Sequence, residues 1–246
     1  MASVLRKRVS GAMVSNELNN KISELWNRHP LEVRGKNHPL YYPKFKTEGI
    51  LFIGINPSFS IKGFKQTLKG TEYEGIDIEK FYSFDNQDFD VEKAIAIEAS
   101  ARKQHDYFQR FNKIAKETGK DWEHIDLFLY RQTSQSDFKK IIGFSNKNGK
   151  LSLNEFGREQ LDLIREKIKK IAPKVIVVVN ALASEILRKE FVIEKLDYDS
   201  KDGFQRLEID ETKIPIFFSG MLTGQRALDN GSFDRLIWHI KRALSK

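Results

Sequence analysis

Short apolar runs, separated by longer amphipathic segments, dominate the pattern of this chain. The clearest run covers residues 175–179, and a second run over 50–53 ends at Gly54. Runs of four or five apolar residues predict β-strands that are buried on both faces, whereas a membrane span needs about 20 such residues in a row. We predict three further strands, over residues 125–130, 204–209 and 214–218.

The amphipathic segments between these runs predict helices. Leu18, Ile22, Leu25 and Trp26 recur at helical spacing near the N-terminus. Further helices are expected over residues 91–116, 152–171, 182–189 and 232–244. Ser152 has the position of a capping-box residue for the second of these.

Parallel strands that are joined by helices require crossover connections. The sequence therefore predicts an α/β fold, a three-layer α/β/α sandwich with a mostly parallel central sheet. The chain shows no internal repeat and no low-complexity linker, so we expect a single domain over residues 1–246. Residues 1–46 are interpreted as a helical and loop extension that packs on this domain.

The charge and the missing cysteines narrow the function classes. The chain has 42 Lys and Arg against 34 Asp and Glu, a net charge of +8, which favours polyanionic partners. The alternative is that basic runs such as residues 165–170 are only a solvated helix face. Without cysteine, thiol nucleophiles, iron–sulfur clusters and cysteine zinc sites are excluded, and the five histidines have no metal-ligand spacing. We expect a cytoplasmic monomer with no metal, no cofactor and no membrane partner.

Ligand sites in such sheets lie beyond the carboxyl ends of the strands, so four loops are of interest. The first loop is Gly54-Ile55-Asn56-Pro57-Ser58-Phe59. Pro57 keeps Asn56 out of the helical region, and the amide of Asn56 can orient a water or read a polar edge. Phe59 offers a flat face for stacking. The alternative is a simple Asn-Pro turn with Phe59 in the core.

This loop resembles the first motif of the uracil-DNA glycosylase superfamily, especially its mismatch-specific and single-strand-selective branches. The order and spacing of the strands from Ile50 to about Arg226 are similar too. The resemblance implies a protein that flips a damaged base out of DNA and hydrolyses its N-glycosidic bond without metal or cofactor. It implies that Asn56 positions the attacking water and that Phe59 stacks on the base. We assign Asn56 and Ser58 to catalysis, and Gly54, Ile55 and Phe59 to base binding.

The other loops depart from the pattern of that family. The family often places an Asn after the second strand, where this chain has Arg131 and Gln132. Either residue can read a base edge, and Arg131 can equally bind phosphate or pair with Asp137. Asn180, in the loop after the strand predicted over residues 175–179, is assigned to base binding, with a helix cap as the alternative.

The last loop lacks the His and Pro that many members of the family carry there. We assign this loop, which extends from Ser219 to Arg226, to DNA contacts. Gly220 offers backbone amides for a leaving anion, and Arg226 is a phosphate anchor. Met221 and Leu222 form an apolar tip that is suited to wedging into a duplex, unless they pack locally.

A long loop is expected over residues 61–87. It interleaves basic and aromatic side chains, as single-strand binding surfaces do; the side chains are Lys62, Phe64, Lys65, Lys69 and Tyr73. We interpret it as a lid over the substrate, with an ordinary insertion as the alternative.

These observations predict a DNA-repair glycosylase-like protein that acts on a deaminated or otherwise altered base in duplex or single-stranded DNA. The first alternative is a protein of the same fold that binds nucleic acid or a nucleotide without catalysis, since the last loop lacks the histidine. The second alternative is an α/β enzyme for a small acidic substrate.

Overall fold

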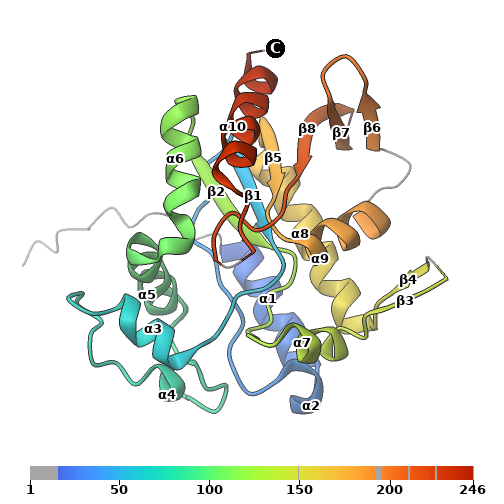
Figure 1. Ribbon diagram of the computed structural model, residues 1–246. Helices are drawn as coiled ribbons and strands as arrows, with labels where there is room; N and C mark the ends of the chain where they lie inside the picture. Colours follow the sequence, from blue (N-terminus) through green and yellow to red (C-terminus); the bar gives the residue numbers. More distant parts are fainter. Residues whose placement is uncertain (1–15, 149, 192–195, 210, 225, 246) are drawn as a thin grey trace, which may run out of the picture.

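The computed structural model describes residues 16–148, 150–191, 196–209, 211–224 and 226–245. A six-stranded sheet in the order β2-β1-β5-β8-β7-β6 forms its centre (Figure 1). The first four strands are parallel, and β7 and β6 continue the sheet in antiparallel pairing. The strands are β1 (Ile50–Gly54), β2 (Trp122–Asp126), β5 (Val175–Val178), β6 (Leu196–Asp199), β7 (Phe204–Ile209) and β8 (Thr212–Phe218).

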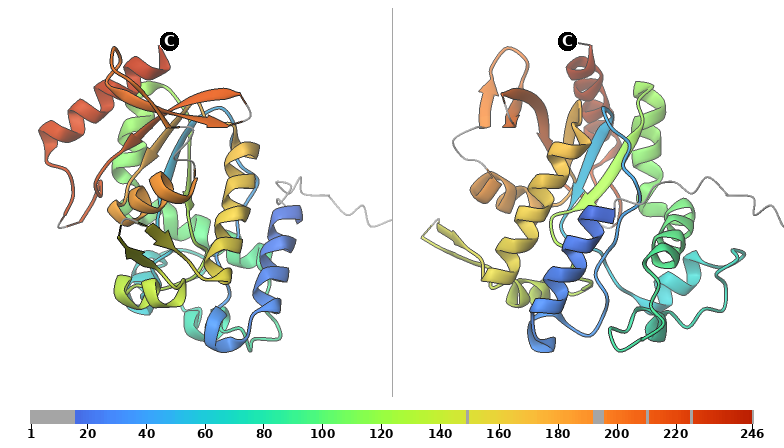
Figure 2. Two further views of the ribbon diagram at one scale, coloured as in Figure 1. Left: turned by 90° about the vertical axis from the view of Figure 1, so that its right-hand side faces the viewer. Right: turned by 180° about the vertical axis from the view of Figure 1, so that it is seen from behind.

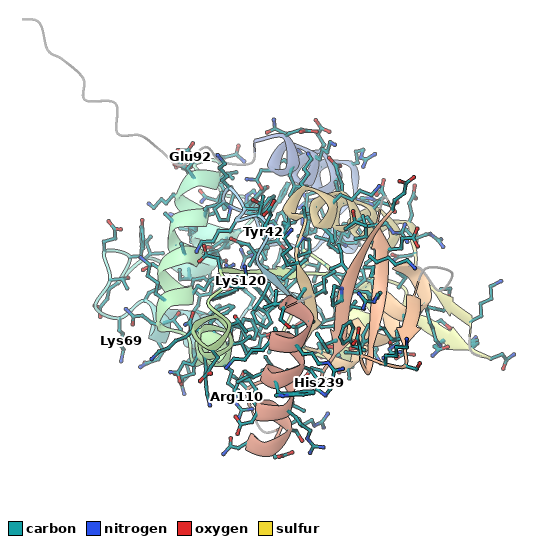
Figure 3. All side chains as sticks on the ribbon, turned by 90° about the horizontal axis from the view of Figure 1, so that it is seen from above. Tyr42, Lys69, Glu92, Arg110, Lys120 and His239 are labelled. Atoms are coloured by element: carbon teal, nitrogen blue, oxygen red, sulfur yellow. The ribbon has the colours of Figure 1, made fainter. Side chains whose placement is uncertain are left out.

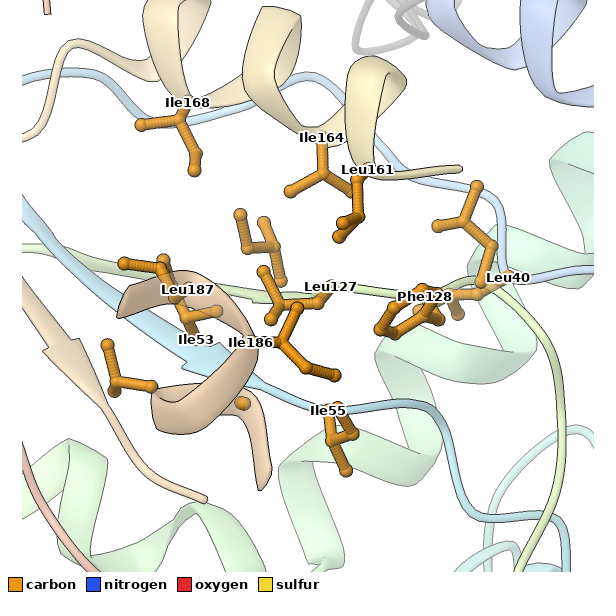
Figure 4. Close-up of a cluster of buried hydrophobic side chains, with 14 of the residues drawn as sticks. Leu40, Ile53, Ile55, Leu127, Phe128, Leu161, Ile164, Ile168, Ile186 and Leu187 are labelled. Carbon is orange, nitrogen blue, oxygen red and sulfur yellow. The ribbon is translucent and has the colours of Figure 1, made fainter. Parts of the chain in front are cut away.

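Helices cover both faces of the sheet, so the predicted three-layer α/β/α sandwich is confirmed (Figure 2). One face carries α8 (Glu155–Ile171) and α9 (Ala181–Ile186), and α1 (Asn16–Arg28) packs on the outside of α8. The other face carries α6 (Gln109–Thr118) and α10 (Asn230–Leu244). Successive side chains of β1 alternate between these two cores: Ile53 joins the α8 side and Phe52 the α6 side. Figure 4 shows Leu161, Ile164 and Ile168 of α8 above Ile53.

Two predicted elements have different bounds in the structure. The strand predicted over 125–130 is β2, which begins at Trp122 and ends at Asp126. The apolar residues that follow it, Leu127, Phe128 and Leu129, are fully buried as a connecting segment. Burial of this segment, rather than strand pairing, accounts for its apolar character.

The helix predicted over residues 91–116 is interrupted. It consists of α5 (Val91–Gln104), a 3₁₀ turn over Asp106–Phe108 and α6. His105 has an extended backbone, and its ring nitrogen Nδ1 accepts a hydrogen bond from the backbone N–H of Tyr107 at 3.1 Å. A side chain that caps a new turn competes with continuation of the helix, so the break occurs here.

The capping residue of α8 also differs from the expectation. Asn154 is the N-cap, and its Oδ1 accepts from the backbone N–H of Gly157 at 2.9 Å. Ser152 instead lies in β4 (Lys150–Ser152), which pairs with β3 (Ser145–Lys147) in a separate hairpin. The strand pairing of Ser152 places the helix start two residues later.

The expectation of an unstructured loop over residues 61–87 is wrong. This segment contains α3 (Ile61–Thr67) and α4 (Ile78–Tyr82), which pack on α5. Leu68, Ile78 and Tyr82 are buried there against Ala94 and Ile97 in a small hydrophobic core of their own. The aromatic residues of this segment therefore have a packing role that its sequence pattern concealed.

The N-terminal extension begins the described chain with α1 and α2 (Leu31–Arg34), while residues 1–15 lie outside the described residues. After α2 the chain runs along the segment that follows β2, where the backbone N–H of Leu40 donates to the carbonyl of Leu129 at 3.1 Å. None of the helices in the described part of the chain combines the length and the apolar composition that crossing a membrane requires.

Candidate functional site

The loops that follow β1 and β2 are joined by hydrogen bonds at the carboxyl edge of the sheet. Backbone N–H groups of Leu127 and Phe128 donate to the carbonyls of Gly54 and Ile55, at 3.2 and 3.0 Å. Farther along, the N–H of Gln132 donates to the carbonyl of Pro57 at 3.1 Å. Two loops that are more than 70 residues apart in the sequence therefore form one rigid platform.

Asn56 lies at the centre of this platform, and its side-chain NH₂ group is held by the second loop. The amide nitrogen Nδ2 is 2.6 Å from the carbonyl oxygen of Gln132 and 3.2 Å from that of Tyr130, with the carbonyl of Pro57 at 3.3 Å. Because every neighbour is an acceptor, the NH₂ group must face them. Within the described residues, Oδ1 of Asn56 has no hydrogen-bond partner, and the side chain is half-buried. Asn56 thus presents an oriented acceptor.

Ser58, Phe59 and Gln132 complete the platform. The hydroxyl groups of Ser58 and Thr133 are 3.1 Å apart, and Thr133 also accepts from the backbone N–H of Phe59 at 3.2 Å. The ring of Phe59 packs edge-to-face on Tyr82, with centroids 5.6 Å apart. Gln132 uses its Oε1 to accept from the backbone N–H of Ser134 at 3.0 Å. One side of the Phe59 ring therefore packs against the small core that α3, α4 and α5 form.

Arg131 is buried, and its guanidinium is already occupied. Its Nη2 forms an ion pair with Glu98 at 2.6 Å, while its Nε donates to the carbonyl of His38 at 3.0 Å. The guanidinium also lies 4.3 Å from the centroid of the Tyr82 ring. The suggested pairing with Asp137 is wrong, because Asp137 pairs with Lys140 instead. With a side chain only 1% exposed, Arg131 reaches neither a base nor a phosphate in this conformation.

Asn180 caps α9. Its Oδ1 accepts from the backbone N–H groups of Leu182 and Ala183, at 2.9 and 3.1 Å. Asn180 is therefore a helix cap, which was the alternative interpretation of this residue. Its side-chain oxygen already accepts two hydrogen bonds within the fold.

The loop after β8 closes on itself. The backbone N–H of Leu228 donates to the carbonyl of Met221 at 2.9 Å, and Gly224 supplies the positive φ of 86° that the turn requires. Leu222 is fully buried in the core between the sheet, α6 and α10, so the expectation that it forms an exposed apolar tip is wrong. Met221 is partly buried and Arg226 is exposed.

Ser219 and Gly220 lie at the start of this loop, next to the sheet. The backbone N–H of Ser219 donates to the carbonyl of Val178 in β5 at 2.8 Å. Its hydroxyl oxygen is buried and has no hydrogen-bond partner among the described residues. Both residues therefore lie at the same edge of the sheet as Gly54.

Two titratable residues beside Gly54 were not assigned to the site from the sequence. His124 and Asp126 of β2 face the same side of the sheet, and both are buried. An added Cβ at Gly54 would clash with the carboxylate of Asp126 and lie 3.0 Å from Nε2 of His124. The sequence signal was only their two-residue spacing in a strand, because the pairing of β2 with β1 is what places them beside Gly54.

Burial shifts the protonation of both groups. Desolvation raises the pKa of Asp126 to about 7, although the charges of Lys167 and Arg102 oppose the shift. Burial also holds the pKa of His124 well below its usual value, with Arg102 and Lys167 acting in the same direction. At neutral pH the histidine is therefore neutral, while the carboxyl can hold or release a proton.

Among the described residues, no group of three or more His, Asp or Glu side chains is arranged to hold a metal ion. What the site offers is an oriented amide acceptor, a titratable buried carboxyl and backbone amides at the edge of a parallel sheet. No protein-family model and no curated protein matches the sequence of this chain.

Proposed function

We propose that this protein is a DNA glycosylase-like enzyme, which hydrolyses the N-glycosidic bond of a deaminated or otherwise altered base. The proposal depends on one observation: the carbonyls of Tyr130 and Gln132 fix the amide of Asn56 so that its Oδ1 is an oriented, unoccupied acceptor. An acceptor in this position can hold a water by one O–H and align its lone pair for attack on the sugar carbon.

Charge and position add support to the proposal. Asn56 lies directly beyond β1 in a sheet with four parallel strands, the edge at which α/β folds bind ligands. The net charge of +8 favours a polyanionic substrate. In this mechanism Asn56 orients the water, whose oxygen bonds to the sugar carbon as the N-glycosidic bond breaks. Backbone amides near Gly220 stabilise the negative charge of the departing base, which takes up the proton that the water releases. Ser58 acts through its contact with Thr133 and thereby positions the loop.

An abasic-site assay tests the proposal, with oligonucleotides that carry uracil, hypoxanthine, xanthine or a mismatch. We expect base release from at least one of them, and a loss of about 100-fold or more in Asn56→Ala. Thr133→Val is the matched control, because it removes both hydrogen bonds of the Thr133 hydroxyl to the first loop and leaves the contacts of the Asn56 amide in place. An equal loss in Thr133→Val would mean that loop clamping, rather than the acceptor, explains the effect.

A binding protein of the same fold is the second candidate. It is favoured by the loop after β8, which has no histidine and buries Leu222. Salt-dependent DNA binding without base release from any of the oligonucleotides would support this candidate and overturn the enzymatic proposal.

A further inference from the structure

A groove opens between the end of β8, the start of β7 and α10, with a volume of about 660 Å³. Volumes of this size are typical of sites for small organic ligands. The groove shares Ser219 and Gly220 with the loop after β8 and extends away from Asn56 toward the antiparallel part of the sheet. It is thus a concavity near the carboxyl edge whose lining does not include Asn56.

The charge of the groove is one-sided. Arg188, Arg235 and His239 line it, and none of the described lining residues is Asp or Glu. In the part of the chain that the structure describes, neither arginine is paired with a carboxylate. Unpaired guanidinium groups beside a cavity attract a bidentate anion such as a phosphate.

Aromatic side chains and polar atoms without hydrogen-bond partners also line this groove. The guanidinium of Arg188 lies 3.8 Å from the centroid of the Phe218 ring, and His239 lies 6.2 Å from Phe217 between ring centroids. Figure 3 shows His239 on α10 beside the β7–β8 strands. The hydroxyl oxygen of Ser219 and Nδ1 of His239 are buried without a hydrogen-bond partner among the described residues. A polar ligand would satisfy such groups.

The N-terminus of α10 is not the anion site. Asp229 caps it, and its carboxylate accepts from the backbone N–H of Ser232 at 2.9 Å and from the hydroxyl of the same residue at 2.6 Å. The positive charge of the groove therefore comes from the arginine side chains.

Trp238 offers a stacking surface for a base beside the groove. It is 53% exposed on α10, one helical turn from Arg235, and its ring centroid is 4.9 Å from that of His239. An exposed indole beside a cationic groove is a surface on which a base stacks.

We propose that this groove binds a nucleoside phosphate, with the phosphate on Arg188 and Arg235 and the base against the aromatic side chains. The ligand is either a free nucleotide or one nucleotide of a strand. The strand version rests on the proposed function, because the strand would continue from the groove to the Asn56 platform. Trp238 would then carry the next base outside the groove.

Calorimetric titration tests the proposal with three probes: deoxyadenosine monophosphate, a deoxyadenosine ten-mer and inorganic phosphate. We expect Arg235→Gln to lower the affinity for the mononucleotide about tenfold, since one charge-assisted contact is lost. Lys36→Gln is the matched control, because it removes the same charge from an exposed position just after α2, which lies at the opposite end of the molecule from α10 (Figure 1). Equal affinities of the two variants, or no binding by the parent protein, would overturn the proposal.

Trp238→Ala separates the two sources of the ligand. A loss of affinity for the ten-mer alone supports a strand nucleotide, whereas a mononucleotide that binds as tightly as the ten-mer supports a free nucleotide. Inorganic phosphate that binds as tightly as the nucleotide would overturn the assignment of a base. If Arg235→Gln loses affinity for the nucleotide and the parent protein releases no base, the groove proposal is supported and the glycosylase proposal is rejected.

Discussion

Lys167 lies inside the fold with its ammonium nitrogen 2.6 Å from the centroid of the Tyr42 ring. It is fully buried, and Nζ has no hydrogen-bond partner among the described residues. Burial therefore lowers the pKa of Lys167 well below its usual value, although Glu123 opposes the shift. The interpretation of residues 165–170 as a solvated face is wrong for Lys167, because this residue lies on the buried face of α8.

We predict that Lys167→Met stabilises the protein at pH 7 by about 1–4 kcal/mol, because an apolar side chain of similar volume replaces a buried amine that has no hydrogen-bond partner among the described residues. The gain depends on pH. As the pH falls below about 10.5, the unfolded chain binds a proton that the folded chain disfavours, so the stability of the parent protein falls. The advantage of Lys167→Met should thus be larger at pH 7 than at pH 9.5.

Urea denaturation at these two pH values measures the effect. Lys174→Met is the control, because Lys174 is exposed and its replacement removes the same charge. An equal gain in the free energy of unfolding in both variants would mean that the change in net charge, and not the burial of Lys167, explains the effect.

Among the secondary-structure elements, α8 shows best how a local pattern can be misread. Ser152-Leu153-Asn154-Glu155 has the spacing of a capping box, yet Ser152 pairs with Ser145 in the β3–β4 hairpin. Asn154 caps the helix with its oxygen and donates from Nδ2 to the carbonyl of Ile141 at 2.7 Å. The amide of Asn154 makes both bonds, whereas Ser152 is held in the hairpin, and this favours the later start of the helix.

We predict that Asn154→Ala lowers the free energy of unfolding by about 1–2 kcal/mol, since an N-cap and a loop contact are lost together. Ser152→Ala should change it by less than about 0.5 kcal/mol. Chemical denaturation of both variants measures this difference. A larger loss in Ser152→Ala than in Asn154→Ala would restore the capping box as the helix start.

The whole molecule combines a net charge of +8 with a sheet whose carboxyl edge is formed by segments that are distant in the sequence. We predict that the affinity for a single-stranded ten-mer falls about tenfold or more between 50 and 200 mM salt, because bound phosphates release counterions. Fluorescence anisotropy at several salt concentrations measures the slope. Polyglutamate serves as the competitor that carries charge without bases or phosphates. Competition by polyglutamate at equal charge concentration would mean that the attraction is non-specific.

The fold class followed from the sequence because apolar runs report burial directly. The runs that became β1, β5, β7 and β8 lie within a few residues of their predicted bounds. The site was less predictable, because the chemistry of its polar residues depends on their neighbours. Asn56 was identified from its place after β1, but the carbonyls that fix its amide come from residues more than 70 positions away.

By itself, the sequence determined a mostly parallel sheet that is covered on both faces, and it determined which loops meet at the carboxyl edge. Apolar periodicity depends only on residues that are close together in the sequence, so it can be recognised in the sequence alone. Only the tertiary structure decided that Arg131, Leu222 and Lys167 are buried and that Arg188 and Arg235 share a groove. Burial and pairing depend on contacts between distant segments, which residue type and spacing do not encode.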